Sequence, residues 1–137
     1  MRSLGRILIV GVAALAAVVP ASAATSYSGS WPVTVTHSQH SNGTFCLTLT
    51  DNGQNGFPHS GSASLVIGSH KYPYGTFQLI NHLMVATIQA QGYSQNAGLV
   101  FVAPASRGTI GQGTYDEVYG GEAFDSGALA FGAKGGC

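Results

Sequence analysis

Two histidines three positions apart offer the first chemistry that this sequence could perform. His37 and His40 flank a Ser-Gln pair, and imidazoles gathered at one end of a fold can bind zinc or copper. Side chains three positions apart on a strand point to opposite faces, so joint ligation requires the chain to turn after His37. No Cys or carboxylate completes a known ligand spacing, and ordinary loop histidines are the alternative. We treat His37 and His40 as candidate metal ligands.

Acidic residues gather near the end of the chain, around a Gly-Gly turn. They are Asp116, Glu117, Glu122 and Asp125. Such carboxylates could hold calcium, or supply the acid and base of a glycoside hydrolase. Their spacing matches no calcium-binding loop, and a solvated hairpin end is the simpler interpretation. An extracytoplasmic hydrolase that combines this patch with His37 or His40 stays an alternative.

Aromatic residues in the expected loops could form a binding platform for a sugar or a partner. They are Phe57, Tyr72, Tyr74 and Tyr93. The alternative is that they only cover one end of the fold with their polar tips in water. A nucleophile is harder to find, because the segment Gly61-Ser62-Ala63-Ser64-Leu65 lacks the second glycine of a nucleophile elbow. No acid, base and nucleophile converge in the sequence, so we expect a non-catalytic protein without a cofactor.

The first 23 residues have the pattern of a signal peptide. Arg2 and Arg6 precede a continuous apolar run over residues 7–19, which is short for a membrane span. Pro20 then interrupts the run, and Ala21-Ser22-Ala23 has the small residues that a signal peptidase requires. We expect a signal-peptide helix over residues 1–23, cleavage after Ala23, and one domain over residues 24–137. An uncleaved N-terminal anchor is the alternative.

The expected mature chain carries little charge. Three basic and five acidic residues follow Ala23, so the net charge is about −2 with His neutral. This balance argues against binding to nucleic acid and against binding to an anionic membrane surface. We expect a secreted or periplasmic monomer that does not insert into the membrane after signal cleavage.

The two cysteines, Cys46 and Cys137, are an even number in a chain with an export signal. Exported proteins meet oxidising conditions, so we expect an intramolecular disulfide between them. Two free thiols or a bond between chains are the alternatives. On the expected strand around Cys46 this residue faces outward, so the C-terminal tail could reach it over the outside of the fold.

The clearest strand pattern is a hairpin with a two-residue turn at Asn81-His82. This turn predicts a register in which Leu79 faces Met84 and Phe77 faces Ala86. Directly opposed residues share one face of a sheet, so these four side chains would line the core together.

Other segments also alternate between apolar and polar residues. We expect strands over residues 28–37, 44–51, 62–67, 99–102, 108–115 and 126–134. The wholly apolar run 99–102 predicts a strand that is covered on both faces. With the hairpin this gives about eight strands joined by short connections, and no helix after the signal peptide. Such a meander predicts an all-β, antiparallel up-and-down barrel, with a β-sandwich as the alternative.

A further feature is a general resemblance to known secreted barrels. The expected mature chain opens with Gly29-Ser30-Trp31 and later carries Gly113-Thr114-Tyr115. Together with the strand pattern this resembles small calycin-like barrels, the lipocalin and avidin group. The resemblance implies that Trp31 closes one end and that the lumen holds a small ligand, although the several ring tryptophans of a biotin pocket are missing.

We take four aromatic residues as candidate ligand contacts: Trp31, Tyr72, Tyr74 and Tyr115. The expected function is binding of a small ligand or of a protein partner. A structural or interaction protein without any pocket is a further alternative.

Overall fold

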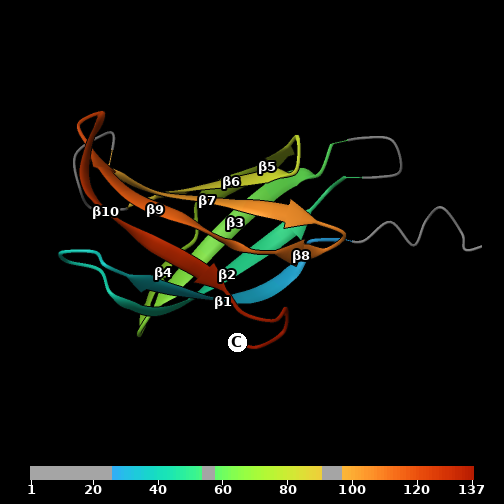
Figure 1. Ribbon diagram of the computed structural model, residues 1–137, viewed down its shortest axis with the longest axis horizontal. Helices are drawn as coiled ribbons and strands as arrows, with labels where there is room; N and C mark the ends of the chain where they lie inside the picture. The colour runs from blue at the N-terminus through green and yellow to red at the C-terminus, as the bar shows by residue number, and fades with distance from the viewer. Residues whose placement is uncertain (1–25, 54–57, 91–96) are drawn as a thin grey trace, which may run out of the picture.

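The computed structural model describes residues 26–53, 58–90 and 97–137, and this part of the chain is all-β. Its strands are β1 (Gly29–Thr36), β2 (Gly43–Asp51), β3 (Ser60–Ile67), β4 (His70–Tyr72), β5 (Gly75–Ile80), β6 (Leu83–Gln89), β7 (Gly98–Ser106), β8 (Thr109–Ile110), β9 (Gln112–Tyr119) and β10 (Glu122–Phe131). Figure 1 shows the strands wrapped around a common interior. The predicted signal peptide falls outside the described residues.

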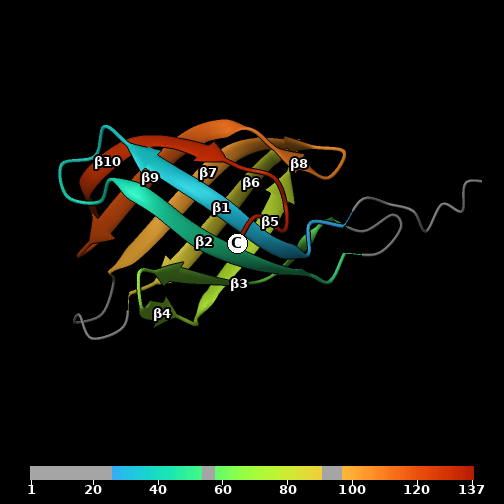
Figure 2. The same cartoon turned by 90° about the horizontal axis from the view of Figure 1, so that it is seen from below.

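Eight of the strands form a closed antiparallel barrel, as the sequence predicts. The order around the barrel is β1-β2-β3-β5-β6-β7-β9-β10, and β1 pairs with β10 to close the ring. Figure 2 shows β1 between β2 and β10 on one side of the barrel. The two short strands lie outside this ring, β4 beside β3 and β8 beside β7. Closure gives each barrel strand two partners, which a β-sandwich does not.

The described residues contain no helix that is long and apolar enough to cross a membrane.

The predicted hairpin is confirmed in position and register. β5 and β6 pair with Leu79 opposite Met84 and Phe77 opposite Ala86. Asn81 and His82 both have positive φ, 48° and 64°. Two-residue hairpins of type I′ require positive φ at both turn positions, because only that twist matches the twist of the strands.

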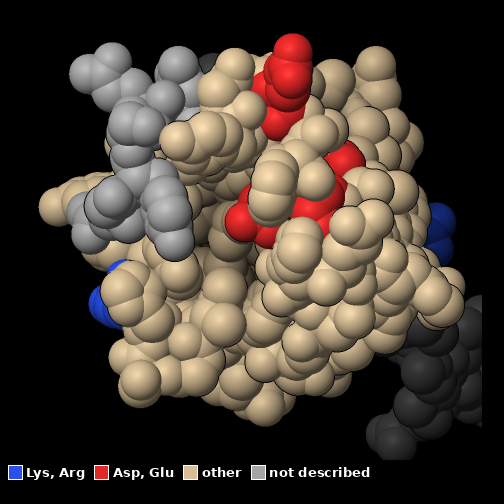
Figure 3. All heavy atoms as spheres, turned by 90° about the vertical axis from the view of Figure 1, so that its left-hand side faces the viewer, with Lys and Arg blue, Asp and Glu red and all other residues tan. Residues whose placement is uncertain are grey.

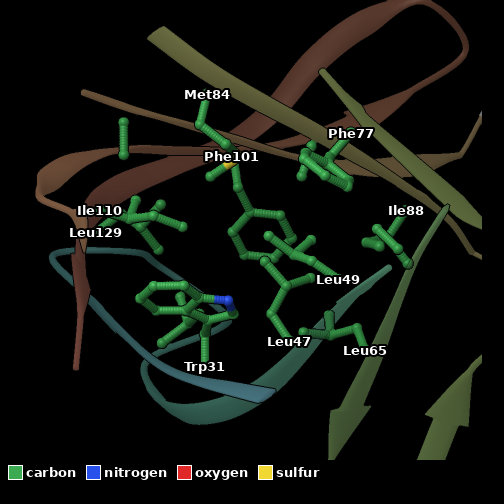
Figure 4. Close-up of a cluster of buried hydrophobic side chains, with 14 of the residues drawn as sticks. Trp31, Leu47, Leu49, Leu65, Phe77, Met84, Ile88, Phe101, Ile110 and Leu129 are labelled. Carbon is green, nitrogen blue, oxygen red and sulfur yellow. The ribbon is translucent and has the colours of Figure 1, made fainter. Parts of the chain in front are cut away.

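Inward side chains fill most of the barrel. The buried residues come from all eight barrel strands and from β8, and Figure 4 shows Trp31, Leu47 and Phe101 packed at the centre of this core. The hairpin contributes Phe77, Met84, Ala86 and Ile88 to the same core. The interior is therefore a packed core over most of its length, and space for a ligand remains only near an end.

Several strands differ from the expected ranges. The strand expected over residues 108–115 is two strands, β8 and β9, and β9 continues to Tyr119. β4 lies inside the segment that was expected to be a loop, and β10 begins at Glu122 rather than at residue 126. β7 continues to Ser106, and it alternates between buried and partly exposed residues, so the prediction of a strand covered on both faces is wrong.

Pro104 does not end β7 because its missing N–H falls where no partner is needed. The carbonyl of Pro104 accepts a hydrogen bond from Gly111 N at 2.8 Å, on the side of β7 that faces β9. The pairing of β7 with β9 ends two residues earlier, at Val102 and Thr114. A strand tolerates proline where the ladder on that side has already ended.

The predicted disulfide is present, with Cα atoms of Cys46 and Cys137 5.9 Å apart. The C-terminal tail runs back along β1, where Gly132 N donates to Pro32 O and Gly135 N donates to Ser30 O, both at 2.7 Å. These bonds bring Cys137 to the outward face of β2, as the strand parity predicts.

Loss of the disulfide should lower the free energy of unfolding by about 2–5 kcal/mol, because the bond closes a long loop in the unfolded chain. Urea unfolding with and without reductant measures this change. The Cys46→Ala/Cys137→Ala variant is the control, and its unfolding midpoint should not respond to reductant. A free-thiol mass shift at both cysteines in unreduced protein would show that the bond is absent.

Replacing His82 by glycine should raise the free energy of unfolding by about 0.5–1 kcal/mol, because glycine adopts positive φ without the steric cost that an L side chain carries. Thermal and urea unfolding measure the gain. His70→Gly, in the exposed strand β4, is the matched control and should lower stability instead. Equal effects at both positions would contradict the assignment of the turn.

Candidate functional site

The two ends of the barrel are built differently, and one of them is closed. At this end, called the closed end below, Tyr27 and Trp31 are both only 2% exposed. Trp31 Nε1 donates to Tyr27 O at 3.0 Å, and Gly108 N donates to the Tyr27 hydroxyl at 3.2 Å. The residues before β1 therefore fold across the end of the barrel and leave little room for a ligand.

Asp51 holds the closed end together. Its carboxylate accepts hydrogen bonds from Tyr27 N at 3.0 Å and from Gly53 N at 2.9 Å, and it contacts His59 Nδ1 at 2.6 Å. Burial alone would raise the pKa of Asp51, but these backbone donors and the His59 imidazole together lower it below its usual value. The acid therefore ties the N-terminal segment to the start of the loop between β2 and β3.

The opposite end, called the open end, contains a cavity of about 460 Å³. Figure 3 looks onto this end and shows acidic side chains beside a recess in the surface. The residues that form its walls come from β3, β4, β7, β9, β10 and the loop over residues 37–42, and they include Ser41, Ile67, Tyr72, Leu99, Tyr115, Glu117, Tyr119 and Phe124. Its size lies within the range of small-molecule pockets, roughly 300–1,000 Å³.

Strand parity sends three side chains from neighbouring strands to the same inner face. Leu99 of β7 lies opposite Glu117 of β9, and Glu117 lies opposite Asp125 of β10. Directly opposed residues share a face of the sheet, so these side chains form a row across the inside of the open end. Tyr115, two residues before Glu117, lies deeper on the same face and is 1% exposed.

Tyr115 forms the base of the cavity. Its ring packs against Phe101, with ring centroids 5.6 Å apart. Burial raises the pKa of Tyr115 to about 12; the side chain of Ser41 lowers this pKa, and the charges of Glu117 and Asp125 act in the same direction as burial. The phenol therefore stays protonated at neutral pH and can donate a hydrogen bond.

Asp125 holds the 37–42 loop over the open end. Its carboxylate accepts from Ser38 Oγ at 2.5 Å, from Gln39 N at 3.0 Å and from His40 N at 3.1 Å. The Ser38 bond, followed by the backbone donors, lowers the pKa of Asp125 to about 2. Asp125 is thus a buried, charged acceptor that fixes the position of Ser41 beside the cavity.

A β-bulge at Phe124 produces this arrangement. The register between β9 and β10 shifts between Ala123 and Asp125, so Phe124 has no opposed partner. The extra residue directs Asp125 inward and leaves Phe124 63% exposed. The Phe124 ring then stacks on His40, with centroids 5.5 Å apart and an angle of 16° between the planes.

The candidate metal ligands lie in the 37–42 loop, and the chain does turn directly after β1, since His37 has a φ of 61°. The His40 ring is engaged with Phe124, while His37 lies beside a shallow hollow of about 270 Å³. Within the described ranges, no group of three or more His, Cys, Asp or Glu residues could hold a metal ion. Metal binding by this histidine pair stays a prediction.

The structure brings together only part of the predicted ligand site. Tyr72 and Tyr115 line the cavity, whereas Trp31 lies in the core at the closed end. Tyr74 is 58% exposed and borders a larger hollow of about 690 Å³, which also includes Thr76 and Thr87 on the outer surface of β5 and β6. Phe57 and Tyr93 lie outside the described residues.

Sequence reasoning did not identify Ser41 as a residue of the cavity wall, and it did not place Glu117 on the inner face of the barrel. Ser41 Oγ donates to a Glu117 carboxylate oxygen at 3.3 Å, and the same side chain lowers the pKa of Tyr115 against the effect of burial. A signal for Glu117 was present, because Tyr115, Glu117 and Tyr119 alternate along one strand. No such local signal exists for Ser41, whose position depends on Asp125.

The histidines and the acidic patch lie in different parts of the barrel or have other contacts. His59 and Asp51 form a histidine–carboxylate pair, but this pair lies at the closed end and supports Tyr27. In the described segments, neither His37 nor His40 has its ring hydrogen-bonded to a carboxylate of the acidic patch. The open end offers apolar walls, a phenol and a carboxylate acceptor to whatever enters the cavity.

No protein-family model, no curated protein and no solved structure matches this chain.

Acid should weaken the 37–42 loop before it unfolds the barrel. Because the pKa of Asp125 is held at about 2 rather than 3.8, its stabilising contribution is complete above pH 3.8 and is lost as the pH falls toward 2. Asp125→Asn should remove this part of the pH dependence and speed amide hydrogen exchange at residues 39 and 40, measured by NMR. Asp116→Asn, on the other face of β9, is the control, and equal effects of both variants would contradict this role.

Proposed function

We propose that this protein is a non-catalytic binding protein of the cell exterior or periplasm, and that it takes a small ligand into the cavity at the open end. The single observation that carries this proposal is the cavity of about 460 Å³ between Tyr72, Leu99 and Tyr115. Apolar walls with a few polar groups are the usual composition of small-molecule sites. A protein without any pocket would have little reason to leave this end unfilled.

The contrast between the two ends supports the choice of site. The closed end uses Tyr27 and Trp31 to complete the core. At the open end the core stops at Tyr115, and the 37–42 loop is held to one side by Asp125 instead of being packed inward. The larger hollow near Tyr74 is bordered by Thr76 and Thr87 of the outer surface, so it lacks the enclosure of the cavity.

The same proposal includes a location outside the cytoplasm and a likeness to the lipocalin and avidin group. The Cys46–Cys137 disulfide supports an oxidising compartment, because such bonds persist mainly outside the cytoplasm. The closed up-and-down barrel with a cavity at one end is consistent with a likeness to the lipocalin and avidin group. In this proposal the protein acts as a monomer, with a small molecule rather than a nucleic acid as its partner.

The test is binding of the neutral fluorescent probe N-phenylnaphthylamine. We expect saturable enhancement of its fluorescence, and we expect Ile67→Trp to weaken binding by about tenfold, because a larger side chain at the cavity wall displaces the probe. Gln112→Trp, an exposed position at the closed end, is the matched control and should bind like the unmodified protein. Absence of binding, or equal loss in both variants, would refute the proposed site.

A further inference from the structure

The charge of the cavity walls points to the class of ligand. Among the described wall residues, Glu117 is the one carboxylate, and there is no Lys, Arg or His. The remaining walls are apolar or aromatic, with Tyr72, Tyr115 and Phe124 among them. Aromatic faces attract cations through the negative charge density of their rings. The walls thus combine a carboxylate with aromatic faces, which is a combination suited to a positive ligand.

A second observation is the pairing of two carboxylates across β9 and β10. Glu117 and Asp125 are directly opposed and share the inner face. Like charges at opposed positions of a sheet destabilise it. Asp125 is compensated by Ser38 Oγ and the backbone of Gln39 and His40, as described above.

The negative charge of Glu117 is balanced by fewer hydrogen-bond donors than that of Asp125. Within residues 26–53, 58–90 and 97–137, its carboxylate has one donor, Ser41 Oγ, at the long distance of 3.3 Å. A carboxylate has room for about four hydrogen bonds, so most of its capacity faces the cavity. A cationic head group there would add donors to Glu117 and would also reduce its repulsion with Asp125.

We propose that the cavity binds an organic cation, in which an ammonium group meets Glu117 and an apolar body lies against Leu99 and Tyr72. This inference rests on the proposed function, since it uses the same cavity. The Tyr115 phenol lies at the base of the cavity, near the same Ser41 side chain that donates to Glu117.

The experiment compares three ligands of one shape and different charge at pH 7: phenylpropylamine, phenylpropanol and phenylpropanoate. Each is titrated as a competitor of N-phenylnaphthylamine. We expect the amine to bind about tenfold more tightly than the alcohol, as a charge-assisted hydrogen bond would give, and the carboxylate to bind most weakly.

Glu117→Gln keeps the size of the side chain and should abolish the difference between amine and alcohol, because it weakens binding of the amine most. Asp116→Asn removes the same charge from the neighbouring residue, which does not line the cavity, and should keep the difference. This control separates contact with Glu117 from the general negative potential of the open end.

The outcomes distinguish the two proposals. If the probe binds and the three ligands compete equally, or if none competes, the cavity is a binding site but not one for cations. If Asp116→Asn and Glu117→Gln reduce amine binding equally, the specific role of Glu117 is refuted. If the probe itself does not bind, the proposed function fails and this inference fails with it.

Discussion

Pairing between the first and last long strands is the constraint on which the structure depends. β1 meets β10 through four residue pairs, from Val33 with Phe131 to Thr36 with Ala128. This pairing turns an open meander into a ring and leaves no long edge strand among the eight. It also fixes the inner face of every strand, because a shift by one residue would turn the apolar side chains outward. The C-terminal tail follows β1 beyond this seam, and the disulfide joins it to β2 next to the seam.

At each end of the barrel, one aspartate accepts hydrogen bonds from backbone N–H groups that have no strand partner. Chain segments that fold over a barrel end leave backbone N–H groups without strand partners, and such groups need acceptors. Asp51 accepts from the backbone of Tyr27 and Gly53 at the closed end, and Asp125 accepts from Gln39 and His40 at the open end. Both carboxylates are stabilised in their charged form, and both have lowered pKa values. The difference is that the closed end adds an aromatic pair to the core, whereas the open end keeps a cavity.

The sequence predicts those parts of the structure that follow from local alternation. The barrel, the register around Asn81-His82 and the outward position of Cys46 all come from period-two patterns and turn chemistry. The contacts of Asp125 with the 37–42 loop join residues more than 80 positions apart, and no local pattern encodes them. They also depend on the bulge at Phe124, which directs Asp125 inward. For the site, the sequence indicates Tyr72 and Tyr115 as aromatic candidates, but it cannot show that Trp31 lies at the other end. Only the strand order around the ring decides which end each aromatic residue reaches.

Glu117 is the residue at which local preference and the needs of the fold disagree most. Asp125, opposite to it, has a structural role that explains its charge, because three groups of the 37–42 loop bind it. Glu117 has a single weak donor and a like charge as its neighbour, so a neutral glutamine would suit the barrel better. Sequences specify folds through choices that agree at every level, and the exceptions gather at functional sites. A cation with an apolar body, as proposed for the cavity, would give the charge at Glu117 a partner and would fit the uncharged aromatic walls around it.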